Sequence, residues 1–533
     1  MTEFQEKTIK FMGKTENPAA NEILLRLLAH HDTNFRTLAF NALYLKKAPE
    51  LLVLLFKQFI NDEEFWGRPE MLPAERLAKI TDAAFRDASG HHRATAAEIT
   101  MKYKLYEMLP TVILYLETQD QDLMRKVLLY LAESFYNDIA DAPIEERRNF
   151  DRKREWFVLQ LDTSVKRYSV HGIDEVLQSL LIVTKKDFDT MKIVTADHRS
   201  ASAKKISELL RTGTHRSYFR ILLSYLDDPS APAVMDTIIA DRSDAQFVRK
   251  LLEIVGRDPS PEFRTALKRF QSIAWFNADN PELPALVAGL EPNAIQLLQS
   301  VNFPKERVIR LYRFFLERPS MESRRAAAES VRWLVGEDIN QMLLKFVDNS
   351  DSQTAAILFK LLKKRGVPGI DDILPTLIER PDAIIRQAIY DMMPELHIET
   401  FASRISQMTP MTAQTMGRYV RLVDPNTFKM IDDDIKSPIP IRRAAACKVA
   451  AVTNYAKEFL PRIIEIAERD DEMPVRLSAI SALSTVLVKE ALESLKRLMG
   501  DRSTDIRDAV ELAVQAWATA YRATTAEQNT DPA

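Results

Sequence analysis

Apolar side chains recur at intervals of three and four residues along much of this 533-residue chain. Near the N-terminus, one such stripe contains Leu24 and Leu28, and the next contains Leu38, Ala39 and Ala42. This spacing gathers apolar residues on one face of an α-helix, whereas a half-buried strand alternates apolar and polar positions. The pattern therefore predicts a succession of amphipathic helices.

Several of these stripes share one frame, in which an apolar residue precedes an arginine and small apolar residues follow three and six positions later. The frame is clear around Arg36 and Arg476, and it returns less regularly around Arg442 and Arg507. Arg442, Arg476 and Arg507 are separated by 34 and then 31 residues. Weaker copies surround four more arginines, Arg125, Arg264, Arg324 and Arg386. These spacings predict an internal repeat of about 31 residues.

The same period predicts two repeats that have lost the arginine. Arg324, Arg386 and Arg442 lie 62 and 56 residues apart, about twice the period, so intermediate repeats are expected near Thr354 and Gln414. A 31-residue unit holds two helices of about 12–14 residues and two short turns. One such pair cannot bury both apolar stripes, but a stack of pairs can. We predict an all-α fold, a right-handed α-α superhelix of stacked helix pairs.

Glycine and proline usage agrees with a helical array. The chain has 12 glycines, where average usage gives roughly 37. Hairpin turns and phosphate-binding loops need more glycine than this. Twenty of the 26 prolines lie between positions 229 and 532, about one per helix and turn. Pro381, Pro438 and Pro474 are expected in the first turns of helices, where proline is tolerated.

The repeat signals divide the chain into four predicted parts. Residues 1–143 contain N-terminal helical repeats, and residues 144–228 form an irregular, basic helical segment that has no proline. Residues 229–521 contain the C-terminal repeats. Residues 522–533 are small and polar, and we expect them to form a disordered tail.

Charge and cysteine usage indicate a cytoplasmic protein. The formal net charge is −3, and the single cysteine, Cys447, lies in an apolar helical run where a buried thiol is expected. The N-terminal residues 1–7 are charged and lack the apolar region of a signal peptide. The longest aliphatic stretch, near residues 51–56, is far shorter than the about 20 residues of a membrane helix. We expect no membrane partner.

A search for chemistry finds no enzyme signature. The chain lacks GxGxxG, GxxxxGK[ST], HExxH and GxSxG motifs. The pairs His30-His31 and His91-His92 would point about 100° apart on a helix, so neither pair suits one metal ion. Asp432–Asp434 precede an expected helix start at Ser437, where acidic residues are favourable. We predict no catalytic, cofactor-binding or metal-binding residue, although an enzyme with an unrecognised pocket stays an open alternative.

These residues resemble the HEAT-repeat family of helical solenoids. Asp470 stands six residues before Arg476, and Asp501 stands six before Arg507, as in the family's turn aspartate and following Val-Arg pair. The resemblance implies that these acids cap second helices and that the arginines reach turn acids of their own or the adjacent repeat. The 31-residue period is shorter than the usual 40–47. It is closer to compact HEAT-like repeats, and armadillo-like variants remain open.

The main functional hypothesis is a non-enzymatic scaffold or adaptor that binds protein partners through an extended concave surface of second helices. Each repeat adds one row of side chains, so a partner is held by many modest contacts. The candidate partner-binding residues are six, Arg152, Lys153, Arg154, Trp156, Arg216 and Arg220.

The alternative function is binding of nucleic acid or a phosphate ligand through residues 145–220. That segment contains 16 basic and 11 acidic residues, and its aromatic residues offer stacking surfaces. The slightly acidic chain as a whole weighs against a nucleic-acid binder. A solvated helix face with Phe150 and Phe157 in the core explains the same residues without any ligand.

Overall fold

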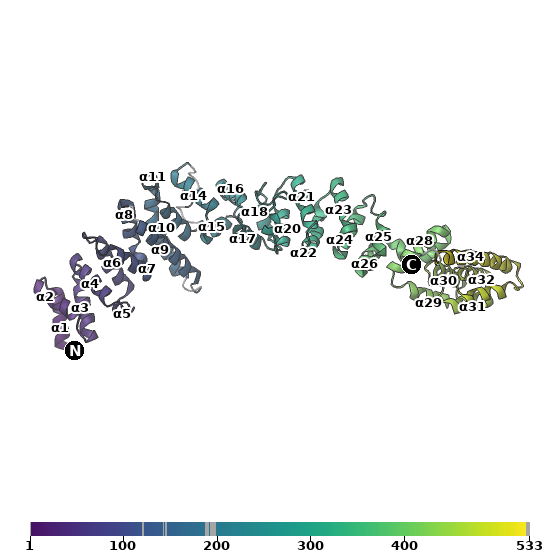
Figure 1. Cartoon of the computed structure of the whole chain (residues 1–533), viewed down its shortest axis with the longest axis horizontal. Helices are drawn as coiled ribbons and strands as arrows, with labels where there is room; N and C mark the ends of the chain where they lie inside the picture. Colours follow the sequence, from purple (N-terminus) through teal and green to yellow (C-terminus); the bar gives the residue numbers. More distant parts are fainter. Residues whose placement is uncertain are drawn as a thin grey trace. The chain divides into compact units, whose positions relative to one another are not determined.

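The computed structural model describes residues 2–119, 122–141, 143, 147–186, 191 and 199–528. Across these ranges the chain forms α-helices and short 3-10 helices, and no strand. Its contacts divide it into two compact units, Met1–Pro304 (unit 1) and Lys305–Ala533 (unit 2). This boundary lies inside the region 229–521 that the sequence treats as one set of repeats. Figure 1 labels the helices in chain order.

Unit 1 begins with two helices that contact α3 and continues as successive pairs. Its helices are α1 (Glu3–Lys14), α2 (Pro18–Leu27), α3 (Thr33–Leu45), α4 (Pro49–Asn61), α5 (Glu63–Trp66), α6 (Ala74–Arg86), α7 (Arg93–Lys102), η1 (Tyr106–Met108), α8 (Leu109–Gln119), α9 (Asp122–Asp141), α10 (Arg147–Lys166), α11 (Tyr168–His171), α12 (Asp174–Val183), α14 (Ala201–Thr212), α15 (Arg216–Leu223), α16 (Ala233–Asp241), α17 (Ala245–Val255), α18 (Pro261–Leu267), α19 (Leu283–Leu286) and α20 (Glu291–Ser300).

Unit 2 is a regular array of seven pairs within its described residues. Its helices are α21 (Lys305–Leu316), α22 (Met321–Ser330), η3 (Val331–Trp333), α23 (Glu337–Asn349), α24 (Ser352–Arg365), α25 (Leu374–Glu379), α26 (Ala383–Met392), η4 (Pro394–Leu396), α27 (Ile398–Arg404), η5 (Ile405–Gln407), α28 (Pro410–Val423), α29 (Thr427–Ile435), α30 (Pro440–Val452), α31 (Leu460–Arg469), α32 (Met473–Leu483), α33 (Lys489–Leu498) and α34 (Thr504–Gln528).

Stacked helix pairs form both units. In unit 2 each odd-numbered helix from α21 to α33 packs against the next even-numbered one, so we call them first and second helices. The second helices also pack on one another in sequence, from α22 through α34. In unit 1 a comparable series of second helices runs through α7, α9, α12, α15, α17 and α20. The all-α fold of a HEAT- and armadillo-like solenoid is confirmed, including second helices near Thr354 and Gln414.

The segment 144–228 takes part in this stacking. Its helices α10 and α12 pack together, and α12 also packs against α9 on one side and α15 on the other. The charged sequence of α10 departs from the repeat frame, but its apolar residues Phe157, Leu161 and Val165 are buried at helical spacing. The pairing of helices therefore continues through this part of unit 1.

Local signals start the second helices of unit 2. Side-chain oxygens of Asp351, Asp382 and Thr409 accept backbone N–H groups in the first turns of α24, α26 and α28. Pro474 lies in the first turn of α32, as expected. Pro381 and Pro438 instead each stand two residues before their helix begins, because Asp382 and Ile439 are the N-caps of α26 and α30.

Arginine–aspartate bonds join consecutive repeats of unit 2. The arginine of one second helix reaches the turn aspartate of the following repeat. These pairs are Arg324–Asp351 at 2.8 Å, Arg443–Asp470 at 2.7 Å and Arg476–Asp501 at 2.5 Å. In unit 1, Arg264 instead pairs with Asp258 of its own turn at 2.9 Å. The arginines thus pair with an aspartate of their own turn or of the next repeat, as expected. One residue differs from the prediction: Arg443, and not Arg442, is the linking residue of α30.

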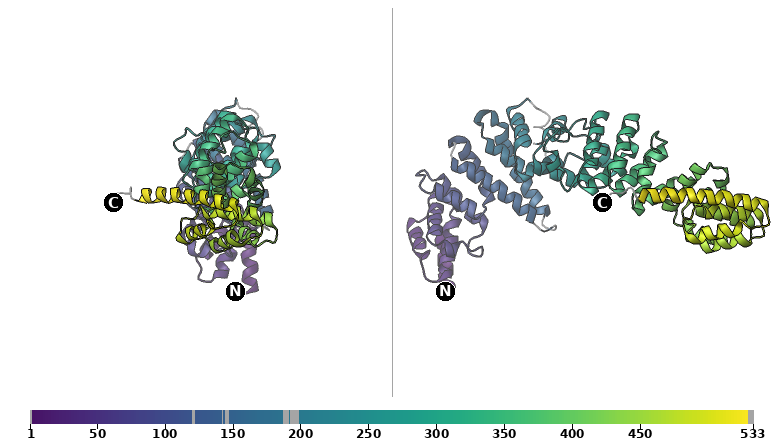
Figure 2. Two further views of the ribbon diagram at one scale, coloured as in Figure 1. Left: turned by 90° about the vertical axis from the view of Figure 1, so that its right-hand side faces the viewer. Right: turned by 45° about the vertical axis from the view of Figure 1, so that its right-hand side comes forward.

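The last helix extends into the predicted tail. α34 continues through Gln528, whereas the sequence predicts disorder from residue 522. Figure 2 shows α34 as the long yellow helix at the end of unit 2. The sequence after Tyr521 is rich in alanine and threonine but contains no proline or glycine before Pro532, so nothing in it forces the helix to stop.

Candidate partner-binding surface

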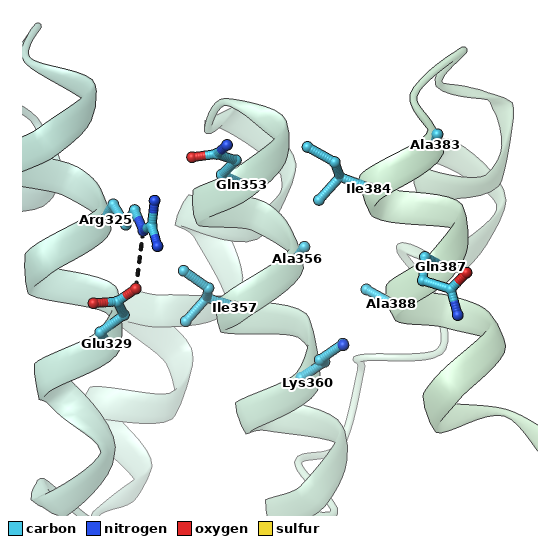
Figure 3. Close-up of a pocket in the computed structure, with 10 residues that line it drawn as sticks. All are labelled: Arg325, Glu329, Gln353, Ala356, Ile357, Lys360, Ala383, Ile384, Gln387 and Ala388. Carbon is cyan, nitrogen blue, oxygen red and sulfur yellow. Dashed lines mark hydrogen bonds and ion pairs between the residues drawn. The ribbon is translucent and has the colours of Figure 1, made fainter.

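The exposed sides of α22, α24 and α26 form a groove of about 600 Å³ in unit 2. Figure 3 shows the three helices side by side, and their lining residues recur at intervals of three and four, which places them on one side of each helix. The lining residues are Arg325, Glu329, Gln353, Ala356, Ile357, Lys360, Ala383, Ile384, Gln387 and Ala388. Arg325 and Glu329 pair with each other at 2.9 Å at one edge. The groove is therefore a product of the repeat, because equivalent positions of successive helices line it.

Ile384 is the most exposed apolar residue of this groove. It is the second residue of α26, it reaches toward α24 in Figure 3, and 44% of it is exposed. The next two second helices also have an apolar residue at the second position after the N-cap. These residues are Met411 in α28 and Ile441 in α30, and each is 81% exposed. We call Ile384, Met411 and Ile441 the apolar row.

The apolar row is continuous from helix to helix, because α26 packs on α28 and α28 packs on α30. Scattered single apolar residues are normal on protein surfaces, but a row at one repeated position is a common feature of interaction sites. The arrangement can bind an apolar segment of another molecule.

In unit 1 the structure separates the six candidate residues of the sequence analysis into two groups. Arg154 is only 2% exposed and donates from Nη1 to Asp151 Oδ1 at 3.1 Å. Arg220 donates to the carbonyl oxygens of Thr184 at 2.8 Å and Ile182 at 3.2 Å, which end α12. Arg220 therefore links α15 to the end of α12, whereas Arg154 is buried and pairs within α10, and we leave both out of the proposed surface.

Burial lowers the pKa of both of these arginines. It lowers the pKa of Arg154, and the positive charge of Arg220 lowers it further. Burial also lowers the pKa of Arg220, whose guanidinium carbon lies 4.9 Å from the centre of the Tyr136 ring. The guanidinium group is so basic that it stays charged, and the aromatic ring and carbonyl oxygens stabilise that charge inside the unit.

The other four candidates are exposed. Arg152, Lys153 and Trp156 lie on α10, and Arg216 is the first residue of α15. Trp156 is 36% exposed, and the Lys153 ammonium group lies 5.6 Å from the ring centre of Phe150. These four residues remain candidates for contact with a partner.

Carboxylates neutralise much of the basic segment. Among the described cations of residues 145–220, six besides Arg154 form ion pairs. These pairs are Lys166–Asp162, Arg167–Glu117, Lys185–Asp151, Lys186–Asp228, Lys205–Asp174 and Arg211–Asp241. Three of the acids, Glu117, Asp228 and Asp241, lie outside the segment, so a charge count within 145–220 overstates the positive charge that a phosphate would meet.

Unit 1 has a larger groove, of about 990 Å³, next to α4 and α6. Its lining includes Leu54, Lys57, Lys79 and the i,i+4 pair of Arg86 with Asp82 at 2.9 Å. Leu54 is an exposed apolar residue of α4 in this groove, but α6 contributes no exposed large apolar residue beside it. This groove is a weaker candidate than the apolar row, because a row at one position can bind an extended partner in a fixed register.

The remaining sequence features are the histidine pairs and the apolar helices. His30 and His31 lie in the turn before α3, where their rings stack at 4.1 Å, so the separation of about 100° expected on a helix does not apply to them. The described residues hold no group of three His, Cys, Asp or Glu side chains placed to surround a metal ion. Within the described part of the chain, no helix has both the length and the apolar character needed to cross a bilayer.

No family model and no curated protein matches the chain. Among solved structures, the chain is similar to Kap95p in a structure with RanGDP, at 9% identity and a TM-score of 0.22, over 84% of this chain and 56% of that one. Kap121p aligns at 12% identity and a TM-score of 0.22, over 95% and 53%. A circular tandem repeat protein aligns at 12% identity and a TM-score of 0.17, over 99% and 100%.

The chain spans about half the length of the Kap95p and Kap121p chains. These identities and TM-scores are too low to transfer the binding properties of those proteins to this chain. Its own architecture defines its class: stacked helix pairs joined by inter-repeat arginine–aspartate bonds make it a helical-repeat solenoid, a class whose repeats build extended surfaces.

Proposed function

We propose that this protein is a non-enzymatic interaction scaffold that binds other proteins along the second helices of unit 2. The apolar row is the observation that carries this proposal, because three consecutive helices present an exposed Ile or Met side chain at the same position. Burying such side chains in an interface contributes about 1.5–3 kcal/mol each. Several modest contacts along a row then add up to a stable complex.

The exposed residues of unit 1 supply a second candidate contact. Arg152, Lys153, Trp156 and Arg216 combine cationic and aromatic side chains, which are enriched in protein interfaces. We propose them as an accessory contact, since no groove or repeated row accompanies them.

The test is affinity capture from native lysate with the full chain and two triple variants. The first variant, I384S/M411S/I441S, removes the apolar row. The second, I23S/L45S/L114S, removes three exposed apolar residues of unit 1 that lie outside α10 and α15, and it is the matched control. We expect reproducible partners with the wild type and the control, and at least tenfold less of them with the row variant. Equal recovery by both variants would contradict the proposal.

A further inference from the structure

In the middle of unit 2, from α23 to α30, the first and second helices differ in charge. The second helices α24, α26, α28 and α30 contain ten Lys and Arg residues and one acidic residue, Asp391. The first helices α23, α25, α27 and α29 contain three basic and eight acidic residues. The net charge of −3 does not show this difference, because it is summed over the whole chain. The helices that carry the apolar row thus belong to the basic set.

Some of these cations stabilise the fold and are not free for a ligand. Arg365 donates to the carbonyl oxygen of Leu334 at 2.7 Å, and Arg421 donates to that of Asn454 at 2.6 Å. Arg443 forms the inter-repeat pair described above. A partner therefore meets the remaining cations, above all those whose side chains extend from the exposed side of each helix.

The exposed cations form a second row. Seven residues after the second helical position stand Lys360 in α24, Arg418 in α28 and Lys448 in α30, which we call the cationic row. Seven residues are about two turns, so each cation lies on the same side of its helix as the corresponding apolar-row position, about 10 Å further along. In α26 the equivalent residue is Asp391, which pairs with Lys360 at 2.7 Å.

Arg418 and Lys448 are accessible in this row. Arg418 pairs with Glu379 at 2.9 Å, but both side chains are more than half exposed. Such a pair contributes little to stability, so a carboxylate of a ligand can take the place of Glu379 at small cost. Lys448 is exposed on α30.

Small side chains and two glutamines lie between the two rows. The sixth residue after the N-cap is Ala388 in α26, Thr415 in α28 and Ala445 in α30, and Gln387 and Gln414 stand one residue before the first two. The surface over α26, α28 and α30 therefore has the apolar row near the start of each helix. Two turns further along it has cations on α28 and α30, and Asp391 on α26. We call the strip between the two rows the channel.

We propose that this channel binds an acidic segment of another protein in a polyproline-type conformation, with apolar residues at every third position. This inference rests on the proposed function. Packed helices lie about 8–10 Å apart, and a polyproline-type chain covers that distance in about three residues, which is one turn and returns the side chain to the same side. Apolar residues at that interval meet Ile384, Met411 and Ile441 in turn, and intervening carboxylates reach Arg418 and Lys448. Nucleic acid suits the channel less well, because the apolar row offers Ile and Met where bases require aromatic rings for stacking.

The experiment is a fluorescence anisotropy titration of the full chain with a synthetic peptide. The probe has about 15 residues, enough to cross four helices, with leucine at every third position, aspartate or glutamate at half of the others and serine elsewhere. A second peptide replaces the leucines by serine, and a single-stranded oligonucleotide of similar length provides a non-peptide polyanion. We expect the leucine peptide to bind at least tenfold more tightly than either of the other probes.

Charge-reversal variants locate the binding. R418E/K448E removes the two accessible cations, and R404E/K429E makes the same change in charge on first helices α27 and α29, where both residues are exposed. We expect at least a tenfold loss of affinity in the first variant and less than a twofold change in the second. Circular dichroism melting curves confirm that both variants are folded before they are titrated.

Three outcomes would overturn the inference: equal binding of the leucine and serine peptides, equal losses in the two charge variants, or tighter binding of the oligonucleotide than of the peptide. Capture of a basic partner through the apolar row would also overturn it, while leaving the proposed scaffold function intact. The capture experiment with I384S/M411S/I441S tests the scaffold function separately, so failure of the scaffold function can be told apart from failure of this inference.

Discussion

At the scale of single residues, two adjacent arginines of α30 have different roles. The Arg443 side chain is 15% exposed and binds both carboxylate oxygens of Asp470, at 2.7 and 3.0 Å. The Arg442 side chain is 62% exposed and lies 3.8 Å from Asp434. The sequence frame selects Arg442, because Ile441 precedes it, but Ile441 is itself exposed and the repeat begins one residue later.

This difference predicts unequal stability effects. Arg443→Ala leaves the mostly buried Asp470 without its partner and should lower the free energy of unfolding by about 2–3 kcal/mol. Arg442→Ala removes an exposed charge and should change it by less than about 0.5 kcal/mol. Urea denaturation of the full chain, followed by circular dichroism, measures both. Equal shifts of the two midpoints would show that Arg443 does not link the repeats.

The turn aspartates predict a dependence of stability on pH. Burial is the largest influence on the pKa of Asp351 and Asp470 and raises both values. The hydrogen bonds from Arg324 and Arg443, the further bonds from Thr354 and the Glu472 backbone N–H, and the arginine charges together outweigh it, so both pKa values lie below 3.8. The hydrogen bond from Arg476 is the main cause of the lowered pKa of Asp501.

Since the unfolded chain binds protons on these carboxylates more readily than the native chain, their contribution is complete above the unfolded pKa, near 4. It is lost as the pH falls through the lowered native values. We expect urea midpoints to be flat above about pH 5 and to fall steeply below pH 4. Arg443→Ala should weaken that fall, because Asp470 then keeps a pKa nearer its unfolded value; an unchanged slope would argue against the assignment.

Cys447 offers a reporter of local opening in unit 2. It is fully buried in α30, and burial raises the pKa of its thiol to about 12. A maleimide at pH 8 should therefore leave the native chain unlabelled over the time in which the urea-unfolded chain reacts completely at this single cysteine. Mass spectrometry measures the labelled fraction, and rapid labelling of the native chain would contradict the buried position that sequence and structure both give it.

The position of Arg154 shows what sequence reasoning missed in the basic segment. Phe150, Arg154 and Phe157 stand at i, i+4 and i+7, so they lie on one side of α10. Placing Phe157 in the core therefore also directs Arg154 inward, and this signal was present in the sequence. No comparable signal exists for Arg220, because the carbonyl oxygens that it binds come from the end of a different helix, 36 and 38 residues away.

At the scale of helices, one glycine fixes the distance between α28 and α30. A Cβ atom at Gly417 would lie 2.6 Å from the carbonyl oxygen of Val452, which is backbone and cannot move aside easily. Glycine to alanine normally stabilises a helix interior by about 1 kcal/mol. Here the clash should reverse the sign.

We therefore expect Gly417→Ala to lower the free energy of unfolding by about 1–2 kcal/mol. Gly500→Ala is the control, because its nearest neighbour would be the Arg497 carbonyl oxygen at 3.7 Å, an ordinary contact. The control should stay within about 0.5 kcal/mol of the wild type. Thermal unfolding of the full chain measures both variants, and a stabilised Gly417→Ala would mean that α28 and α30 pack less closely than described.

The helices that sequence could predict are those with a strong apolar stripe and a clear start. The frame located α30, α32 and α34, and the doubled spacing located α24 and α28. The acidic run Asp432–Asp434 was misplaced, because it ends the first helix α29 and does not precede a helix start. A run of charged residues does not by itself indicate whether it begins or ends a helix. The burial of Ile431 and Ile435 shows that the run belongs to the end of α29.

At the scale of the whole molecule, the sequence repeats predicted the solenoid but did not indicate the candidate partner-binding surface on unit 2. A net charge averaged over a segment selected residues 145–220 of unit 1, where many cations turn out to be paired. The structure shows which helices are first and which are second. When the charged residues are counted separately for the two sets, the second helices from α24 to α30 prove to be basic. Without the helix bounds, alternating acidic and basic helices appear as an ordinary mixed sequence.

The most direct test of the scaffold function is site-specific photo-crosslinking in native lysate. A photoreactive amino acid replaces Met411 on α28 in one version of the chain and Lys429 on the first helix α29 in another, and both positions are exposed. Proteins linked to each are identified by mass spectrometry. The account predicts reproducible crosslinks from position 411 that are absent from position 429. Crosslinks from 429 alone, or the same proteins from both positions, would contradict binding along the second helices of unit 2.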